Sequence, residues 1–206
     1  MRFPQLRFAF LEGGAAWACS LLGDLLGHWE KRNRDAIGQY DPAALDRGQL
    51  DALFAQHAEG RVRERVDRLA DGLNMLSEPI VGDDVLDEFA ESQIGGPDDI
   101  VEVFTDRYYF GCEADDPMAS LAFDRARNPS GARLPALFAS DIGHWDVPDF
   151  ARVVCEAWEL VENDHLDLSD FRAFTFGNPV ALWSGTNPNF FAGTTIEDAV
   201  DAERRK

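Results

Sequence analysis

The sequence predicts an α/β fold with a small, mostly parallel sheet, because short apolar segments alternate with helical patterns and lead into acidic residues. The apolar segments are residues 6–11 (LRFAFL), 108–113 (YYFGCE) and 134–140 (LPALFAS). Each is followed by at least one stretch of helical periodicity, which is the order typical of βα units. With 206 residues, 45% of them hydrophobic, the chain is long enough to bury a core, and we expect one domain.

The first predicted strand, residues 6–11, runs directly into Glu12-Gly13-Gly14, a sequence that favours a turn. A helix is predicted over residues 15–32, with two cations in its last turn, where they interact favourably with the helix dipole. Its apolar side chains recur at helical spacing: Trp17, Leu21, Leu25 and Trp29. This segment therefore provides the first complete βα unit.

Residues 41–97 contain helical patterns only, and we interpret them as a helical insertion between the first two strands. The patterns cover residues 42–58, 61–76 and, more weakly, 85–92. Asp41 is expected to cap the first of these helices, with Pro42 in its first turn. The pair Gly95-Gly96 then ends the insertion.

The remaining elements follow the second and third strands. A short helix is predicted over residues 98–107, and the third strand leads directly to Asp141. After it, residues 148–161 form an amphipathic helical pattern that begins at Pro148. A further helix is predicted over residues 168–183, with Ser169 as its N-cap and an interruption at Asn178-Pro179.

The net charge of −19 restricts the partners of the chain. Nucleic acid and anionic membrane surfaces are disfavoured by repulsion, whereas a metal cation or a positively charged protein surface is not. The cysteines, Cys19, Cys112 and Cys155, are far apart and form no CxxC motif. Because no signal peptide and no apolar run of about 18 residues is found, we expect a cytoplasmic protein.

Asp141 and His144 are the strongest candidates for a functional site. Loops that leave the carboxyl ends of parallel strands converge on one face of the sheet, and Asp141 follows the third strand directly. A carboxylate and an imidazole three residues apart suit a divalent cation, with Zn the first choice and Mn or Fe the alternatives. The structural alternative is that Asp141 caps the helix that follows it.

Several longer segments resemble the amidohydrolase-2 family, relatives of aminocarboxymuconate-semialdehyde decarboxylase. FASDIGHWD, followed by DFRAFTFGNPVALW, resembles the last βα unit and closing helix of that family. FPQLRFAFLEGGAAW resembles its sixth strand, and YYFGCEADDP resembles its seventh. The resemblance implies the C-terminal part of a TIM-like (β/α)8 barrel of metal-dependent hydrolases, rich in helices and with about three parallel strands.

The resemblance also implies roles for individual residues. Asp141 matches the last-strand aspartate, which binds the metal or takes a proton from the metal-bound water, and His144 matches a catalytic position in the turn after it. Glu12 stands where many members have a histidine ligand, so either its carboxylate replaces that ligand, which makes Glu12 the second expected metal ligand, or the ligand is lost. Glu113 and Trp145 are expected to line the substrate pocket.

The sequence lacks other ligands that such an enzyme needs. Of its histidines, His28, His57 and His165 fall outside any His-x-His pair. The family resemblance therefore implies a metal-dependent hydrolase or decarboxylase acting on C–N or C–C bonds of a small organic substrate, inactive without an N-terminal half. The alternative is a non-catalytic remnant or interaction module that pairs its sheet edges with another subunit or with a second copy.

Overall fold

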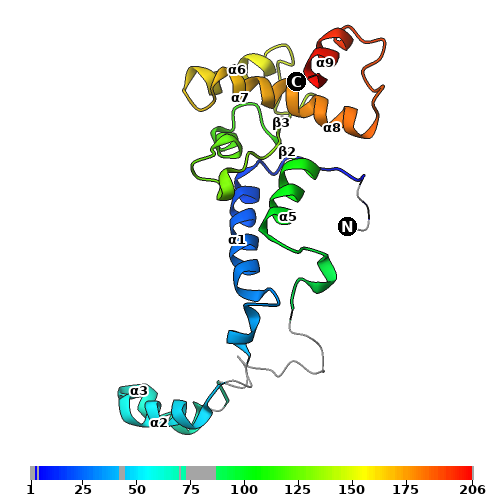
Figure 1. Ribbon diagram of the computed structural model, residues 1–206. Coiled ribbons are helices and arrows are strands. Elements are labelled where there is room, and N and C mark those ends of the chain that lie inside the picture. Colours follow the sequence, from blue (N-terminus) through cyan, green and yellow to red (C-terminus); the bar gives the residue numbers. More distant parts are fainter. Residues whose placement is uncertain (1–2, 4, 42–44, 70, 73–86, 206) are drawn as a thin grey trace. The chain divides into compact units, whose positions relative to one another are not determined.

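The computed structural model describes residues 3, 5–41, 45–69, 71–72 and 87–205 (Figure 1). The chain divides into two compact units, one drawn from Met1–Trp29 and Ser92–Lys206 and the other from Glu30–Glu91. The helical insertion predicted over residues 41–97 overlaps the second unit. No described helix has the length and apolar character needed to cross a membrane.

A three-stranded parallel sheet lies in the first unit. Its strands are β1 (Phe8–Phe10), β2 (Tyr108–Cys112) and β3 (Ala136–Phe138), in the order β1-β2-β3. Phe110 of β2 is in register with Phe10 on one side and Ala136 on the other. The parallel sheet and the position of each strand confirm the sequence prediction. The third strand begins at Ala136 and not at residue 134, since Pro135 has no amide hydrogen to donate to a neighbouring strand, and it ends at Phe138, before the predicted end at residue 140.

The helices of this unit cover both faces of the sheet. They are α1 (Ala16–Arg32), α5 (Pro97–Glu102), α6 (Val153–Glu162), α7 (Leu168–Arg172), α8 (Asn178–Thr186) and α9 (Glu197–Arg204). π-helical turns at Val103–Arg107 and Ala173–Gly177 extend α5 and α7, and 3-10 helices span Pro117–Phe123 and Pro129–Gly131. Figure 1 shows α1 and α5 on one side of β2 and β3, with α7 and α8 on the other.

The core is built around the central strand β2. Phe110 is fully buried. The centroid of its ring lies 5.6 Å from that of Trp17 in α1 and 6.4 Å from that of Phe104 in the π-helical turn after α5. On the opposite face, Tyr109 packs with Leu137 of β3 and Leu182 of α8. Burial of these large apolar side chains fixes β2 at the centre, because each contributes about 1.5–3 kcal/mol when removed from water.

The helices after β3 begin differently from the prediction. The pattern over residues 148–161 becomes helical only at Val153, because Asp149 instead accepts a hydrogen bond from the amide of Ala151 (3.1 Å) and forms a turn. The N-cap of α7 is Asp167 and not Ser169, since the Asp167 carboxylate accepts the amide of Asp170 at 2.7 Å. Pro179 does not interrupt the helix, because it lies in the first turn of α8, where its missing amide costs no hydrogen bond.

The second unit contains α2 (Arg47–His57), α3 (Gly60–Arg63) and 3-10 helices at Ile37–Tyr40, Val66–Arg68 and Ala90–Ser92. Pro42 lies outside the described residues. The cap is Asp46 and not Asp41, since the Asp46 side chain accepts the amide of Gln49 at 2.8 Å. The helix predicted over residues 61–76 is not continuous in the part that the structure describes. The amides of Arg65 and Arg68 bond to carbonyls three residues earlier in the chain, which is the pattern of a 3-10 helix.

The free cysteines differ sharply in their surroundings. Cys112 on β2 is fully buried, and this burial raises the pKa of its thiol to about 12, whereas Cys155 on α6 is exposed. Because the thiolate is the reactive form, we expect iodoacetamide to modify Cys155 and to leave Cys112 intact in the folded protein. Peptide mass spectrometry measures this, and equal labelling of both residues in the native state would contradict the buried position of β2.

The same buried thiol makes folding stability depend on alkaline pH. The pKa of Cys112 is 9.0 when unperturbed and about 12 in the folded chain, so the neutral form is favoured by folding. Its contribution is fully present below pH 9 and is lost at about 1.4 kcal/mol per pH unit as the pH rises towards 12. Cys112→Ser tests this directly, since its unfolding free energy is expected to fall less steeply over that range than that of the wild type.

Candidate metal site

Glu12 lies in the loop between β1 and α1, two residues beyond the end of the strand. Its backbone is in the left-handed region, with a φ of 62°. The amide of Gly14 donates to the carbonyl of Gly111 on β2 (3.1 Å), which attaches this loop to the central strand. The side chain of Glu12 is exposed, so its carboxylate is free to rotate towards a ligand.

Asp141 and His144 lie in the turn after β3. The amide of His144 donates to the carbonyl of Asp141 (3.0 Å), and the Ser140 hydroxyl accepts the amide of Ile142 (3.4 Å). Asp141 also has a left-handed backbone, with a φ of 49°. This tight turn places Nδ1 of His144 3.3 Å from Oδ2 of Asp141.

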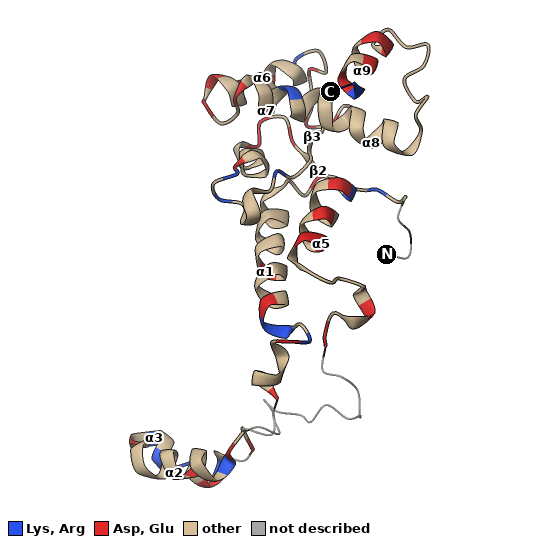
Figure 2. Cartoon of the chain, in the orientation of Figure 1, with Lys and Arg blue, Asp and Glu red and all other residues tan. Residues whose placement is uncertain are grey.

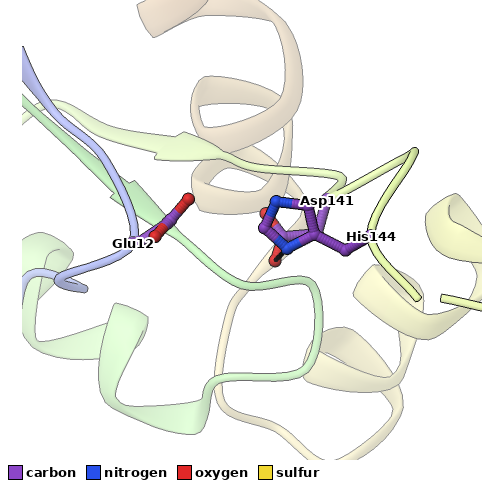
Figure 3. A group of neighbouring side chains, drawn as sticks. All are labelled: Glu12, Asp141 and His144. Carbon is purple, nitrogen blue, oxygen red and sulfur yellow. Dashed lines mark ion pairs between the residues drawn. The ribbon is translucent and has the colours of Figure 1, made fainter. Parts of the chain in front are cut away.

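The two loops bring three potential ligands together. One ligand atom from each of Glu12, Asp141 and His144 lies within 4.8 Å of the other two. Figure 3 shows the carboxylate of Glu12 directed towards the Asp141–His144 pair from the neighbouring loop. Atoms bound at about 2.1 Å to one transition-metal ion in a tetrahedral arrangement lie about 3.4 Å apart. The ligand atoms therefore need to approach one another by up to about 1.4 Å, which exposed side chains achieve by rotation.

The composition of this group suits a divalent cation. Two carboxylates and one imidazole combine oxygen and nitrogen donors that Zn, Mn and Fe all accept. Three protein ligands leave at least one coordination position for water or substrate, as in catalytic sites. The side chains of Asp141 and His144 are 26% and 52% exposed, so solvent and a small molecule can reach the group.

The structure places the other predicted residues outside this group. Glu113 directly follows β2 and is exposed, but none of its atoms belongs to the ligand cluster found among the described residues. Trp145 is 93% exposed and directed into solvent. Among the described histidines, His28, His57 and His165 also lie outside the cluster.

Sequence reasoning missed two residues that shape the site. The sequence indicates only the end of a strand at Ser140, whereas its hydroxyl helps to form the turn that presents Asp141. At Gly111 the sequence indicates only an aromatic strand, whereas the Glu12 loop packs against this glycine. The residue type of Gly111 is itself a signal, since a glycine inside a strand often marks a close approach of another backbone segment.

Comparisons with protein-family models, with curated proteins and with solved structures found no match for this chain. The resemblance to the amidohydrolase-2 family therefore rests on the sequence segments themselves.

Proposed function

We propose that the chain binds a single divalent cation through Glu12, Asp141 and His144 and takes part in metal-assisted hydrolysis or decarboxylation of a small organic molecule. The observation that carries this proposal is the convergence of two carboxylates and an imidazole, from loops far apart in the sequence, on one end of a parallel sheet. The carboxyl end of such a sheet is where α/β proteins bind their ligands.

The residues of the site have separate tasks in this proposal. A bound cation polarises a carbonyl and lowers the pKa of water to about 7. Asp141, the least exposed of the three, accepts the proton of the attacking water and returns it to the leaving group. His144 would supply the nitrogen ligand through Nε2, while the Asp141 carboxylate, 3.3 Å from Nδ1, orients its ring. Glu12 supplies the second negative charge.

The family resemblance supports a particular context for this chemistry. Three parallel strands, each followed by helices, are what the C-terminal part of a (β/α)8 barrel requires. In such a barrel, N-terminal strands supply the His-x-His pair and a further histidine, and substrate turnover requires these histidines. Binding of the cation does not require them, because Glu12, Asp141 and His144 all come from this chain.

The edge of the sheet supports a second candidate function, that of an interaction module. Among the described strands, β1 pairs only with β2, so its other side offers unpaired backbone groups. Phe8 and Phe10 on this strand are 49% and 37% exposed. An apolar strand with one open edge is a suitable surface for strand addition by another chain.

A Mn²⁺ titration followed by calorimetry tests the metal proposal. The wild-type chain is expected to bind one ion, and Glu12→Gln is expected to weaken binding by about 100-fold, because it removes one of three ligands and a negative charge. Glu113→Gln is the matched control, since it makes the same change at the end of the neighbouring strand and should leave the affinity unchanged. A wild-type chain that binds no Mn²⁺, Zn²⁺ or Fe²⁺ would overturn the proposal.

A further inference from the structure

The position of Glu12 next to Asp141 needs a structural explanation. β2 lies between β1 and β3, and neighbouring strands in a sheet are about 4.8 Å apart, so the ends of β1 and β3 are separated by about 10 Å. The ligand atoms of Glu12 and Asp141 nevertheless lie within 4.8 Å of each other. The two side chains span part of this gap, and the chain after β1 also turns across the end of β2, since the amide of Gly14 donates to the carbonyl of Gly111 (3.1 Å).

Gly111 is the point on β2 that this crossing segment contacts. A Cβ atom built on Gly111 would lie 3.1 Å from Cα of Leu11, 3.0 Å from its Cδ2 and 3.4 Å from the carbonyl oxygen of Phe10. Nearly all carbon–carbon contacts in proteins are longer than this. A methyl group at position 111 would thus occupy the space through which the residue before Glu12 passes.

Position 111 requires a glycine because of the space around it and not because of its backbone conformation. Gly111 lies inside β2 and does not have a positive φ. Its carbonyl accepts the amide of Gly14, so Gly111 contacts the Glu12 loop on both sides of Glu12. The lack of a side chain lets the loop approach, and the hydrogen bond keeps it there.

We propose that Gly111 is a positioning residue for the metal site, and that the absence of a side chain on it allows the loop of residues 11–14 to carry Glu12 across β2 to Asp141 and His144. This inference rests on the proposed metal site. Gly111 contacts no ligand atom itself, and its effect on the cation passes through Leu11 and Glu12.

Gly111→Ala is expected to weaken Mn²⁺ binding about 10-fold, because the loop must shift by a few tenths of an ångström or more and a misplaced ligand costs affinity. In a Glu12→Gln background the same change is expected to have no further effect, since the ligand that it displaces is already gone. Gly27→Ala on α1 is the matched control, because nothing lies within 4 Å of a Cβ at that position.

The outcomes separate this inference from the metal proposal. A wild-type chain that binds none of Mn²⁺, Zn²⁺ and Fe²⁺ overturns the metal proposal itself. A wild-type chain that binds Mn²⁺ while Gly111→Ala binds equally well overturns only the role of Gly111, as does an equal loss in the Glu12→Gln background. If Gly111→Ala does not fold, Leu11→Ala is used, since it removes the side chain that packs over Gly111 and leaves position 111 unchanged. A weaker Mn²⁺ affinity than that of the wild type supports positioning of Glu12 through this contact, and an unchanged affinity overturns it.

Discussion

Asp141→Asn is expected to reduce Mn²⁺ affinity by about 100-fold or more while leaving the fold intact. The change removes a negatively charged ligand and also the carboxylate that lies 3.3 Å from His144, so two of the three ligand positions are affected. The backbone at residue 141, with a φ of 49°, suits asparagine at least as well as aspartate. Calorimetric titration measures the affinity, and thermal unfolding without metal checks the fold.

Asp164→Asn provides the matched control for this variant. Asp164 lies in the turn between α6 and α7, is exposed and has a similar left-handed backbone, with a φ of 57°. Both variants change the net charge by the same amount, so a general electrostatic effect on cation binding would appear in both. Loss of affinity confined to Asp141→Asn supports direct ligation, whereas a normal affinity in Asp141→Asn would rule out Asp141 as a ligand.

The backbone at the site is consistent with a functional demand. Glu12 and Asp141 are two of five non-glycine residues with positive φ in the part of the chain that the structure describes. A left-handed backbone costs a non-glycine residue about 1–3 kcal/mol, and asparagine or aspartate tolerates it better than glutamate does. Position 12 would therefore be more stable as glycine, and the proposed metal site supplies a reason for a glutamate there.

The sheet could be predicted from the sequence because each strand is a short, continuous apolar segment followed by a turn signal and a helix. That pattern depends only on local residue types, and it placed all three strands correctly. The π-helical turns before β2 and α8 could not be predicted in the same way. In the sequence these segments read as ordinary helix. A π-helical turn holds one more residue than an α-helical turn, and its place is seen only in the structure, where Phe104 and Phe174 pack into the core.

The site was predictable to the extent that it is local. Asp141 and His144 are three residues apart in one turn, so their proximity followed from spacing. The general convergence of strand ends would favour Glu113, on the central strand, as the nearest partner. The family resemblance indicates Glu12, and the structure brings Glu12 to this pair because the loop after β1 crosses β2 at Gly111, a contact between distant segments that residue spacing alone does not contain.

If two copies pair through β1, Phe8→Lys is expected to convert the wild-type oligomer into a monomer. Phe8 is 49% exposed on β1, beside backbone groups that no other described strand pairs with, and a lysine on an edge strand prevents strand addition. Because the chain carries a net charge of −19, repulsion opposes association of two copies, and the wild-type complex is expected to strengthen as salt is added. Size-exclusion chromatography with light scattering gives the mass in low and high salt.

Leu168→Lys is the matched control, because Leu168 is 66% exposed on α7, away from the sheet edge. General relief of hydrophobic aggregation would make both variants monomeric, whereas pairing through β1 predicts that only Phe8→Lys dissociates. A wild-type chain that is monomeric in both salts would contradict pairing between copies. Strand addition by a different protein would then be the only form of the interaction module left, and the open edge of β1 would still be its expected contact.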